Sequence, residues 1–230
     1  MIRNIKKQSR VRDSRFFDLG REKFDAIVVG AGPSGTTVAL IMAKAGLSVA
    51  LLERGDYPGA KNMYGGAIYR WPLELVVPDF VERAPIERRV VDHRLMILSK
   101  NSGLTLSFKD LGFAKPPYNA FTALRAKFDR WYASLAEEAG ALLLTSVNVT
   151  DLIWKDKKII GVKAGEGSEN ELYGDIVVAA DGASSKLAIK AGLKQPLNLK
   201  DVALGVKEIL EIDSKIIESR FNLGKKEGVA

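Results

Sequence analysis

The sequence predicts an α/β protein with a three-layer domain, built on a parallel sheet with a β-meander, and an incomplete α+β second domain. Three patterns indicate this class. A βαβ pattern occupies residues 24–53, and about 30 residues is the length that one such unit needs. Short strand patterns joined by lysine- and glycine-rich turns over 147–173 predict the meander. An apolar strand pattern returns at 175–180, as expected for a buried strand of a parallel sheet.

Each element of the βαβ unit has its own signal. Residues 24–29 are apolar and rich in β-branched side chains, which predicts a buried parallel strand. A helix is predicted over 33–45, because Pro33 suits the first turn of a helix and Gly46 suits the left-handed position after its end. Residues 47–53 predict the second strand.

The chain then departs from this alternation. Residues 54–72 are rich in glycine, tyrosine and proline and have no helical period, so they predict a long ordered loop. A short helix is expected around 73–81, followed by strands near 90–98 and 104–108. We expect this insert to form a layer separate from the parallel sheet.

The helical pattern returns over 124–139, where apolar residues recur at helical spacing. An Asp-Gly turn, formed by Asp181 and Gly182, directly follows the apolar strand at 175–180. The other expected elements are strands at 142–145 and 202–210 and helices at 186–191 and 214–221.

The composition excludes several classes of function. The sequence has no cysteine, which excludes disulfides, a thiolate nucleophile and cysteine-ligated zinc or iron–sulfur clusters within this chain. The single histidine, His93, is interpreted as an ordinary polar residue, and no metal site is expected. No apolar run has the roughly 18–20 residues that a membrane-spanning helix needs.

Basic residues are concentrated in an N-terminal arm, residues 1–23, within a chain of net charge +7. Such an arm could contact nucleic acid, anionic lipid or an acidic partner protein, or act as a targeting peptide. Its interspersed acidic residues argue against targeting, and a solvated extension is our preferred interpretation. The rest of the chain is too weakly basic to predict a nucleic-acid partner.

The turn after the first strand has the sequence Gly30-Ala31-Gly32-Pro33-Ser34-Gly35, a GxGxxG between strand and helix. The first glycine permits the sharp turn, the second lets a pyrophosphate approach the backbone, and the third lets helix and strand pack closely. Glu53 ends the second strand, where a carboxylate can accept hydrogen bonds from the hydroxyls of an adenosine ribose. These features predict a dinucleotide site.

The βαβ unit alone is compatible with either FAD or NAD. A nicotinamide dehydrogenase would continue with alternating strands and helices into a complete dinucleotide-binding sheet. Here the chain leaves for an insert and returns through one helix to a meander and a second Asp-Gly turn. This organisation favours FAD, so we expect a three-layer FAD-binding domain.

Several segments resemble one flavoprotein family. Residues 25–55 are similar to the glutathione-reductase-like flavoproteins of the aromatic hydroxylase and geranylgeranyl reductase branch. Residues 57–66 (YPGAKNMYGG) look more specifically like FixC, which groups with the electron transfer flavoprotein:quinone oxidoreductases. The segments 124–139, 175–185 and 202–209 (VALGVKEI) also resemble FixC, so the similarity covers about residues 24–228.

The resemblance implies cofactor contacts at matching positions. The FAD pyrophosphate would lie on Gly30, Gly32, Pro33, Ser34 and Gly35. The ribose would contact Glu53, and the adenosine would lie beside Arg54. The other implied FAD contacts are Arg125 at the phosphates, Val149 at the adenine, Asp181 and Gly182 in the second cofactor turn, and Lys61, Gly65 and Gly66 toward the isoalloxazine. Simpler roles remain open for three of these positions: a surface ion pair for Arg125, a core position for Val149 and a solvated cation for Lys61.

The resemblance further implies a domain division and a function. Residues 24–56 and 120–190 would form the FAD domain, and 57–119 with 191–230 would form part of a substrate or quinone-side domain. The implied activity is electron transfer from an electron transfer flavoprotein to a quinone or to a ferredoxin-like protein, with no assigned catalytic residue. The implied location is the cytoplasm, with peripheral membrane contact and no nucleic-acid partner.

Three other functions stay open. A prenyl-lipid reductase of the geranylgeranyl reductase type and a flavin monooxygenase are the enzymatic alternatives, and a truncated FAD-binding module without catalysis is the third. Family members continue beyond 400 residues and carry a later Gly-Asp motif over the flavin ribitol, which this sequence lacks. We therefore expect a fragment, a split gene or a second chain that supplies the remainder.

Overall fold

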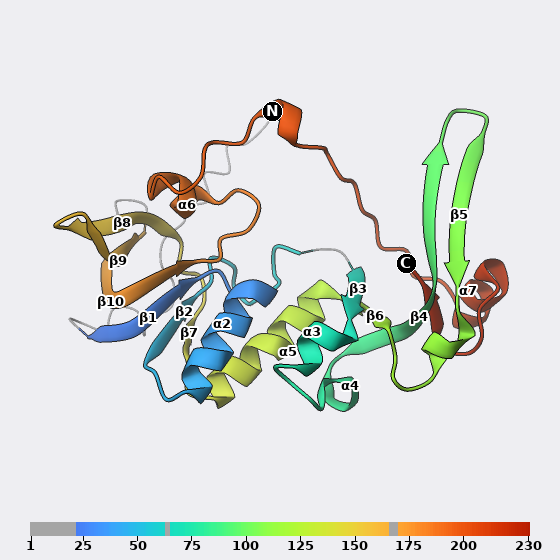
Figure 1. The fold of residues 1–230 in the computed structure, drawn as a ribbon, viewed down its shortest axis with the longest axis horizontal. Helices are drawn as coiled ribbons and strands as arrows, with labels where there is room; N and C mark the ends of the chain where they lie inside the picture. Colours follow the sequence, from blue (N-terminus) through green and yellow to red (C-terminus); the bar gives the residue numbers. More distant parts are fainter. Residues whose placement is uncertain (1–21, 63–64, 166–169) are drawn as a thin grey trace, which may run out of the picture. The chain divides into compact units, whose positions relative to one another are not determined.

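The computed structural model describes residues 22–62, 65–165 and 170–230 (Figure 1). Contacts divide the chain into two compact units: the first unit is Met1–Lys61 with Asp129–Gly205, and the second unit is Asn62–Phe128 with Val206–Ala230. Residues 120–128, expected in the FAD domain, lie in the second unit, and residues 191–205 lie in the first. Most of the basic N-terminal arm, residues 1–21, lies outside the described ranges.

The first unit is built on a six-stranded sheet in the order β7-β2-β1-β10-β9-β8. The strands β7, β2, β1 and β10 pair in parallel, whereas β9 and β8 continue the sheet as an antiparallel meander. Their bounds are β1 Lys23–Val29, β2 Val49–Leu52, β7 Leu142–Leu144, β8 Val149–Lys155, β9 Lys158–Ala164 and β10 Asn170–Ala179. The expected α/β class, with its parallel sheet and meander, is confirmed.

The strand β10 belongs to both parts of this sheet. Its first residues pair with β9, and from Tyr173 onward it pairs with β1. The sequence predicted two separate strands here, at 171–173 and 175–180. They form one continuous strand in which Gly174 pairs with Phe24 of β1, and an added Cβ on Gly174 would approach Ile27 to 3.0 Å. The second cofactor turn therefore follows the part of β10 that pairs with β1.

Helices and a buried core complete the first unit. The helix α2 (Pro33–Lys44) packs against β1 and β2, and α6 (Lys186–Lys190) packs against β8. The helix α5 (Arg125–Glu138) begins in the second unit and ends in the first. Short apolar side chains of the central strands form the core, including Ile27, Leu52, Leu144, Val162 and Leu172, each at most 1% exposed. This core holds the carboxyl ends of the parallel strands in place.

The second unit contains a sheet in the order β11-β4-β6-β3, with β5 paired to the far end of β4. The long strand β4 (Ile86–Leu98) pairs first with β6 (Ala120–Leu124), then in parallel with β11 (Glu227–Val229), and last with β5 (Gly103–Lys109). The remaining elements are β3 Gly65–Tyr69, α3 Arg70–Glu74, α4 Phe80–Arg83, α7 Ser214–Phe221 and the 3₁₀ turn at Leu111–Ala114. Figure 1 shows β4 and β5 leaving this sheet as a long two-stranded ribbon.

Several expectations for this unit are wrong. The loop predicted at 54–72 contains β3, whose two leading glycines carry little strand propensity. The helix predicted at 73–81 is divided into α3 and α4, because Pro78 disfavours a helical conformation in the residue before it. The strand predicted at 202–210 does not form, since these residues pair with no other strand of the described chain.

In the described ranges no helix is both long and apolar enough to cross a bilayer.

A buried carboxylate fixes the base of the β4–β5 ribbon. Asp92, at 1% exposure, accepts hydrogen bonds from Nε and Nη2 of Arg94 at 3.0 and 2.6 Å and from the Ser107 hydroxyl at 2.7 Å. Arg94 also donates to the carbonyl of Phe221, and Lys109 donates to that of Asn222, which joins the ribbon to the end of α7. The hydrogen bond from Arg94 holds the pKa of Asp92 below its ordinary value, with Ser107 contributing in the same direction and burial opposing both.

We expect this carboxylate to make stability pH-dependent. Because the pKa of Asp92 is lower in the folded state, its contribution is present above the unfolded-state pKa of about 3.9 and is lost as the pH falls below it. Asp92→Asn should lower the free energy of unfolding at pH 7 by about 1–3 kcal/mol, because it weakens the charged bond to Arg94. Urea titrations between pH 3 and 7 measure both effects. Glu82→Gln, at an exposed carboxylate of α4, is the control and should change neither.

Candidate cofactor site

The turn between β1 and α2 leaves the start of the helix open. Gly30 has a φ of +105°, and its N–H donates to the carbonyl of Leu52 at 2.8 Å, so the turn is tied to β2. Gly32 is the N-cap of α2, and no side chain of the described residues caps it. The first turn of α2 also contains no acidic residue. An uncapped helix start with a positive dipole end is a suitable site for a phosphate group.

The three glycines of this turn are required for different reasons. A Cβ on Gly35 would lie 1.9 Å from the Gly30 carbonyl oxygen, and one on Gly30 would lie 2.4 Å from the carbonyl oxygen of Ala180. Both glycines are therefore needed by the fold itself. A Cβ on Gly32 would meet nothing within 4 Å. No packing contact in the protein therefore requires glycine at position 32. A pyrophosphate in the open space beside it would require glycine, so the turn fits the diphosphate of FAD.

Glu53 lies at the carboxyl end of β2 and joins two loops. Its Oε2 accepts a hydrogen bond from the N–H of Ala31 at 3.1 Å, and its Oε1 accepts one from the N–H of Gly55 at 2.7 Å. The Glu53 backbone is held by Leu144 and Val147. A carboxylate offers about four lone-pair sites, so both oxygens keep capacity for ribose hydroxyls. The first role of this side chain is to fix the glycine-rich turn, which the sequence did not predict.

The second cofactor turn lies beside the first. The N–H of Ala180 donates to the carbonyl of Val29 at 2.9 Å, so the ends of β10 and β1 are adjacent. Asp181 accepts a hydrogen bond from the N–H of Leu187 at 2.9 Å and thereby holds the start of α6. Gly182 has a φ of +77°, a conformation that favours glycine. The glycine-rich turn, Glu53 and Asp181-Gly182 thus follow three neighbouring strands, β1, β2 and β10, at one edge of the sheet.

Three further predicted positions of the first unit have less distinctive surroundings. Arg54 follows Glu53 directly and is exposed, as is Lys61. Val149 begins β8, where it pairs with Ala164 and packs against the buried core. The side chain of Val149 therefore has the core position that was left open for it. The predicted contact of its backbone with adenine stays a prediction.

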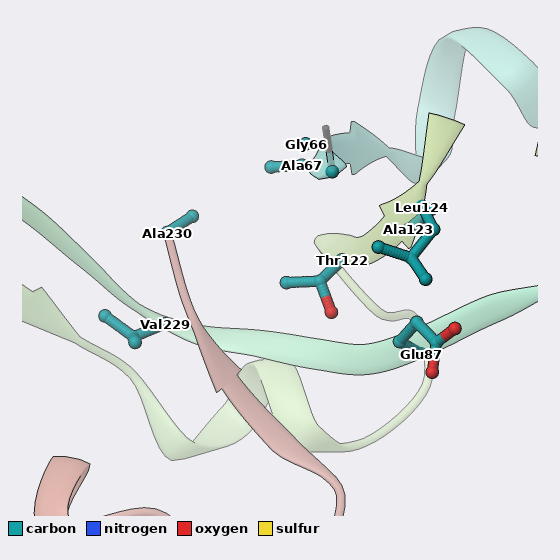
Figure 2. Close-up of a pocket in the computed structure, with 9 residues that line it drawn as sticks. Gly66, Ala67, Glu87, Thr122, Ala123, Leu124, Val229 and Ala230 are labelled. Carbon is teal, nitrogen blue, oxygen red and sulfur yellow. The ribbon is translucent and has the colours of Figure 1, made fainter. Parts of the chain in front are cut away.

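The remaining predicted positions belong to the second unit. Gly65 and Gly66 lie on β3, opposite Leu124 and Ala123 of β6, and Arg125 opens α5. The two glycines line a pocket of about 300 Å³ together with Glu87, Thr122 and the end of β11 (Figure 2). A Cβ on Gly66 would meet nothing within 4 Å. Glycine at this position is therefore not required by the unit's own packing, and the small residues around it leave room for a ligand.

A hydrogen-bonded pair that the sequence argument missed supports the start of α2. The hydroxyl of Thr37 donates to the carbonyl of Pro33 at 2.7 Å and lies 2.8 Å from the hydroxyl of Tyr132. Tyr132 is 2% exposed, and burial raises the pKa of its hydroxyl while the bond to Thr37 opposes the shift. Tyr132 follows Phe128 by four residues on the apolar side of the predicted helix, and this spacing could have predicted its burial.

The comparisons with known proteins agree with this geometry. The family described as FAD dependent oxidoreductase matches residues 25–131. FixC of Escherichia coli K12 is 39% identical over 212 residues, covering 92% of this chain and 49% of that protein. FixC of Azorhizobium caulinodans is 43% identical over 209 residues, covering 90% of this chain and 48% of that protein. The resemblance to FixC is confirmed.

Solved structures support the same fold. A geranylgeranyl bacteriochlorophyll reductase-like protein from Thermoplasma acidophilum is 28% identical, with a TM-score of 0.62 over 76% of this chain and 43% of that one. A myxobacterial FAD-dependent halogenase, CndH, is 26% identical, with a TM-score of 0.58 over 74% of this chain and 39% of that one. These comparisons confirm the prediction of FAD as cofactor and the resemblance to FAD-dependent oxidoreductases. The chain spans about half the length of the FixC proteins it matches.

Substitution of two glycines should separate cofactor space from packing space. Gly32 has φ −77° and ψ 177°, which alanine adopts without strain, so Gly32→Ala should leave thermal stability unchanged and weaken FAD binding at least tenfold, about 1.4 kcal/mol. Gly35→Ala should lower stability in the absence of FAD by about 1–3 kcal/mol or more, because the helix must move away from β1. Circular dichroism melting and flavin fluorescence titration measure the two effects. Tight FAD binding by Gly32→Ala would contradict the placement of the pyrophosphate.

Glu53 should act on both the turn and the ribose. Glu53→Gln should weaken ADP binding about 10- to 150-fold, because hydrogen bonds to a charged group contribute about 1.5–3 kcal/mol. Isothermal titration with ADP and with 2′,3′-dideoxy-ADP separates the two roles. If Glu53 accepts the ribose hydroxyls, the substitution should cost much less affinity for the dideoxy nucleotide. Equal losses of affinity for both nucleotides would contradict a contact with the ribose and show that Glu53 acts only by fixing the turn.

Proposed function

We propose that this protein is a FixC-like oxidoreductase, which passes electrons from an electron transfer flavoprotein through FAD to a quinone or a ferredoxin-like acceptor. The proposal rests on the similarity to FixC together with the unfilled space beside Gly32 at the start of α2. Because the chain spans about half of the FixC length, the activity belongs to the assembled protein and not to these residues alone.

We assign the cofactor contacts by the resemblance to FixC, supported for the glycine-rich turn, Glu53 and Asp181-Gly182 by their position at the ends of β1, β2 and β10. The pyrophosphate is bound by Gly30, Gly32, Pro33, Ser34 and Gly35. The nucleotide end is held by Glu53 and Arg54, with Arg125 at the phosphates and Val149 at the adenine. The other assigned contacts are Asp181 and Gly182 in the second turn and Lys61, Gly65 and Gly66 toward the flavin ring.

FAD supplies the redox chemistry when it is bound. The residues of this chain bind it, orient it and tune its surroundings. Glu53 fixes the turn through two backbone N–H groups. Tyr132 and Thr37 support the first turn of α2, which faces the phosphates. We assign no general acid or base to the residues of this chain.

The proposed partners follow from the proposed reaction. They are the subunits of an electron transfer flavoprotein, a ferredoxin-like protein and a quinone. Since the chain contains no cysteine, an iron–sulfur cluster in this assembly must be bound by other residues than those of this chain. A quinone is dissolved in the bilayer, so the proposal places the protein in the cytoplasm with peripheral contact at the membrane surface.

One alternative function has its own observation. The Thermoplasma acidophilum protein described as geranylgeranyl bacteriochlorophyll reductase-like has the same fold over 76% of this chain. A prenyl-lipid reductase would use FAD to saturate a double bond of a lipid and would not need an electron transfer flavoprotein. The identity of 28% with that protein is lower than the 39% and 43% with FixC, which favours the electron-transfer function.

The electron donor and acceptor decide between these functions. We expect anaerobic stopped-flow absorbance to show quinone-dependent oxidation of a reduced electron transfer flavoprotein. The protein is measured as the FAD-loaded chain, with and without the complementary half of Azorhizobium caulinodans FixC. The Gly32→Ala variant is the matched control, and it should lose the rate in proportion to its bound FAD. Rapid flavin reduction by NADPH with oxygen uptake would indicate a monooxygenase, and saturation of a prenyl lipid would indicate a reductase; either result would overturn the proposal.

A further inference from the structure

The turn after β10 contains a residue whose backbone conformation is strained for its type. Ser185 has a φ of 44° and a ψ of 42°, in the left-handed region that residues with a Cβ rarely adopt. Gly182, three residues earlier, also has a positive φ, but glycine adopts such a conformation without strain. A strained residue persists only where its surroundings hold it, and such residues concentrate at ligand sites. Ser185 therefore needs contacts that keep it in place.

Hydrogen bonds of the Ser185 side chain supply these contacts. Its hydroxyl donates to the carbonyl of Gly182 at 2.8 Å, and its N–H donates to the same carbonyl at 3.0 Å. The hydroxyl oxygen accepts a hydrogen bond from Nζ of Lys194 at 3.0 Å. The same Nζ donates to the carbonyl of Ala183 at 3.4 Å. Because Nζ is charged, its hydrogen bonds are stronger than those between neutral groups, and Lys194 thus joins two residues of the turn.

The end of α6 brings Lys194 to this position. Gly192 has a φ of +73°, and its N–H donates to the carbonyl of Ile189 at 3.0 Å. The N–H of Leu193 donates to the carbonyl of Ala188 at 2.9 Å. These two bonds form a Schellman motif, which ends the helix and turns the chain back. Lys194 therefore lies beside the start of the same short helix, next to the second cofactor turn.

The order of the strands indicates which half of the cofactor this turn faces. In the sheet, β1 lies between β2 and β10. The proposed contacts place the adenosine ribose at Glu53, after β2, and the pyrophosphate at Gly32, after β1. A dinucleotide that continues in the same direction reaches the end of β10, where residues 181–185 follow. On this proposed path the turn borders the flavin half of FAD, beyond the part that FAD shares with ADP.

We infer that Lys194 is a positioning residue, which acts through Ser185 to fix the turn that the flavin half of FAD binds against. The inference rests on the proposed cofactor contacts, and it gives Lys194 no contact with the cofactor itself. Because the hydrogen bonds of Lys194 order the turn in advance, FAD binding costs less conformational entropy. Without them, the cofactor would have to order the turn as it binds.

Fluorescence titration with FAD and isothermal titration with ADP test this role. Lys194→Met removes the charged donor but retains most of the aliphatic stem. It should weaken FAD binding about tenfold, the loss expected for one charge-assisted hydrogen bond, and change ADP binding less than about twofold. Lys194→Arg retains a charged donor and should restore most of the affinity for FAD. Lys186→Met, the same change of charge one residue after Ser185, is the matched control and should bind both nucleotides normally.

A double-mutant cycle with Ser185→Gly tests whether Lys194 acts through Ser185. Glycine adopts the left-handed conformation without support. Lys194→Met should therefore weaken FAD binding less than about threefold when Ser185→Gly is also present, so that the two effects are not additive. A direct attraction between Lys194 and the phosphates would persist in that background and would also act on ADP.

Three outcomes would overturn the inference. The first is an affinity of Lys194→Met for FAD equal to that of the wild-type chain. The second is an equal loss of affinity for FAD and for ADP, and the third is a loss that Ser185→Gly does not reduce. These results would leave the proposed cofactor contacts standing, since the wild-type chain still binds FAD. Failure of the wild-type chain to bind FAD would overturn those contacts and the inference together.

Discussion

The start of α2 lies so close to the end of β1 that no side-chain carbon fits between Gly35 and the carbonyl of Gly30. This contact sets the direction of the helix and hence where its free N–H groups point. It also brings the turn against Ala180 at the end of β10, so that the ends of neighbouring strands meet at one edge. The cofactor site is thus a consequence of packing: the fold needs two of the three glycines, and the third, Gly32, leaves the space that a phosphate can occupy.

Glu53 extends this constraint to the next strand. Its carboxylate accepts hydrogen bonds from the N–H groups of Ala31 and Gly55. The side chain is therefore already ordered before a nucleotide binds. Binding groups that are already fixed cost less conformational entropy on association. Thr37 and Tyr132 likewise order the first turn of α2 before binding, through hydrogen bonds to the Pro33 carbonyl and to each other. We therefore expect affinity for the cofactor to depend also on hydrogen bonds within the protein that do not involve the cofactor.

The sequence predicted the first unit better than the second, for a physical reason. The βαβ unit, α5 and β9 have strong local signals, namely apolar periods bounded by glycine and proline. In contrast, β3 and β6 are short, and glycine or an adjoining helix hides their pattern. They are defined by long-range pairing, β3 with β6 and β6 also with β4. The proposed cofactor contacts of Gly30 to Gly35 follow from their spacing. The bond from Ala31 to Glu53 could not, because it depends on a fold in which two turns 22 residues apart come together.

The failed strand prediction at 202–210 is informative about the protein as a whole. Its sequence is rich in apolar residues and resembles FixC, yet these residues pair with no strand of the described chain. Local propensity is weak without a neighbour, since a strand gains its hydrogen bonds only from pairing. The β4–β5 ribbon is also apolar on the face of Leu95 and Leu106, which the described residues leave exposed. In both segments, therefore, the apolar sequence predicts a covered strand, and the described residues do not supply the cover.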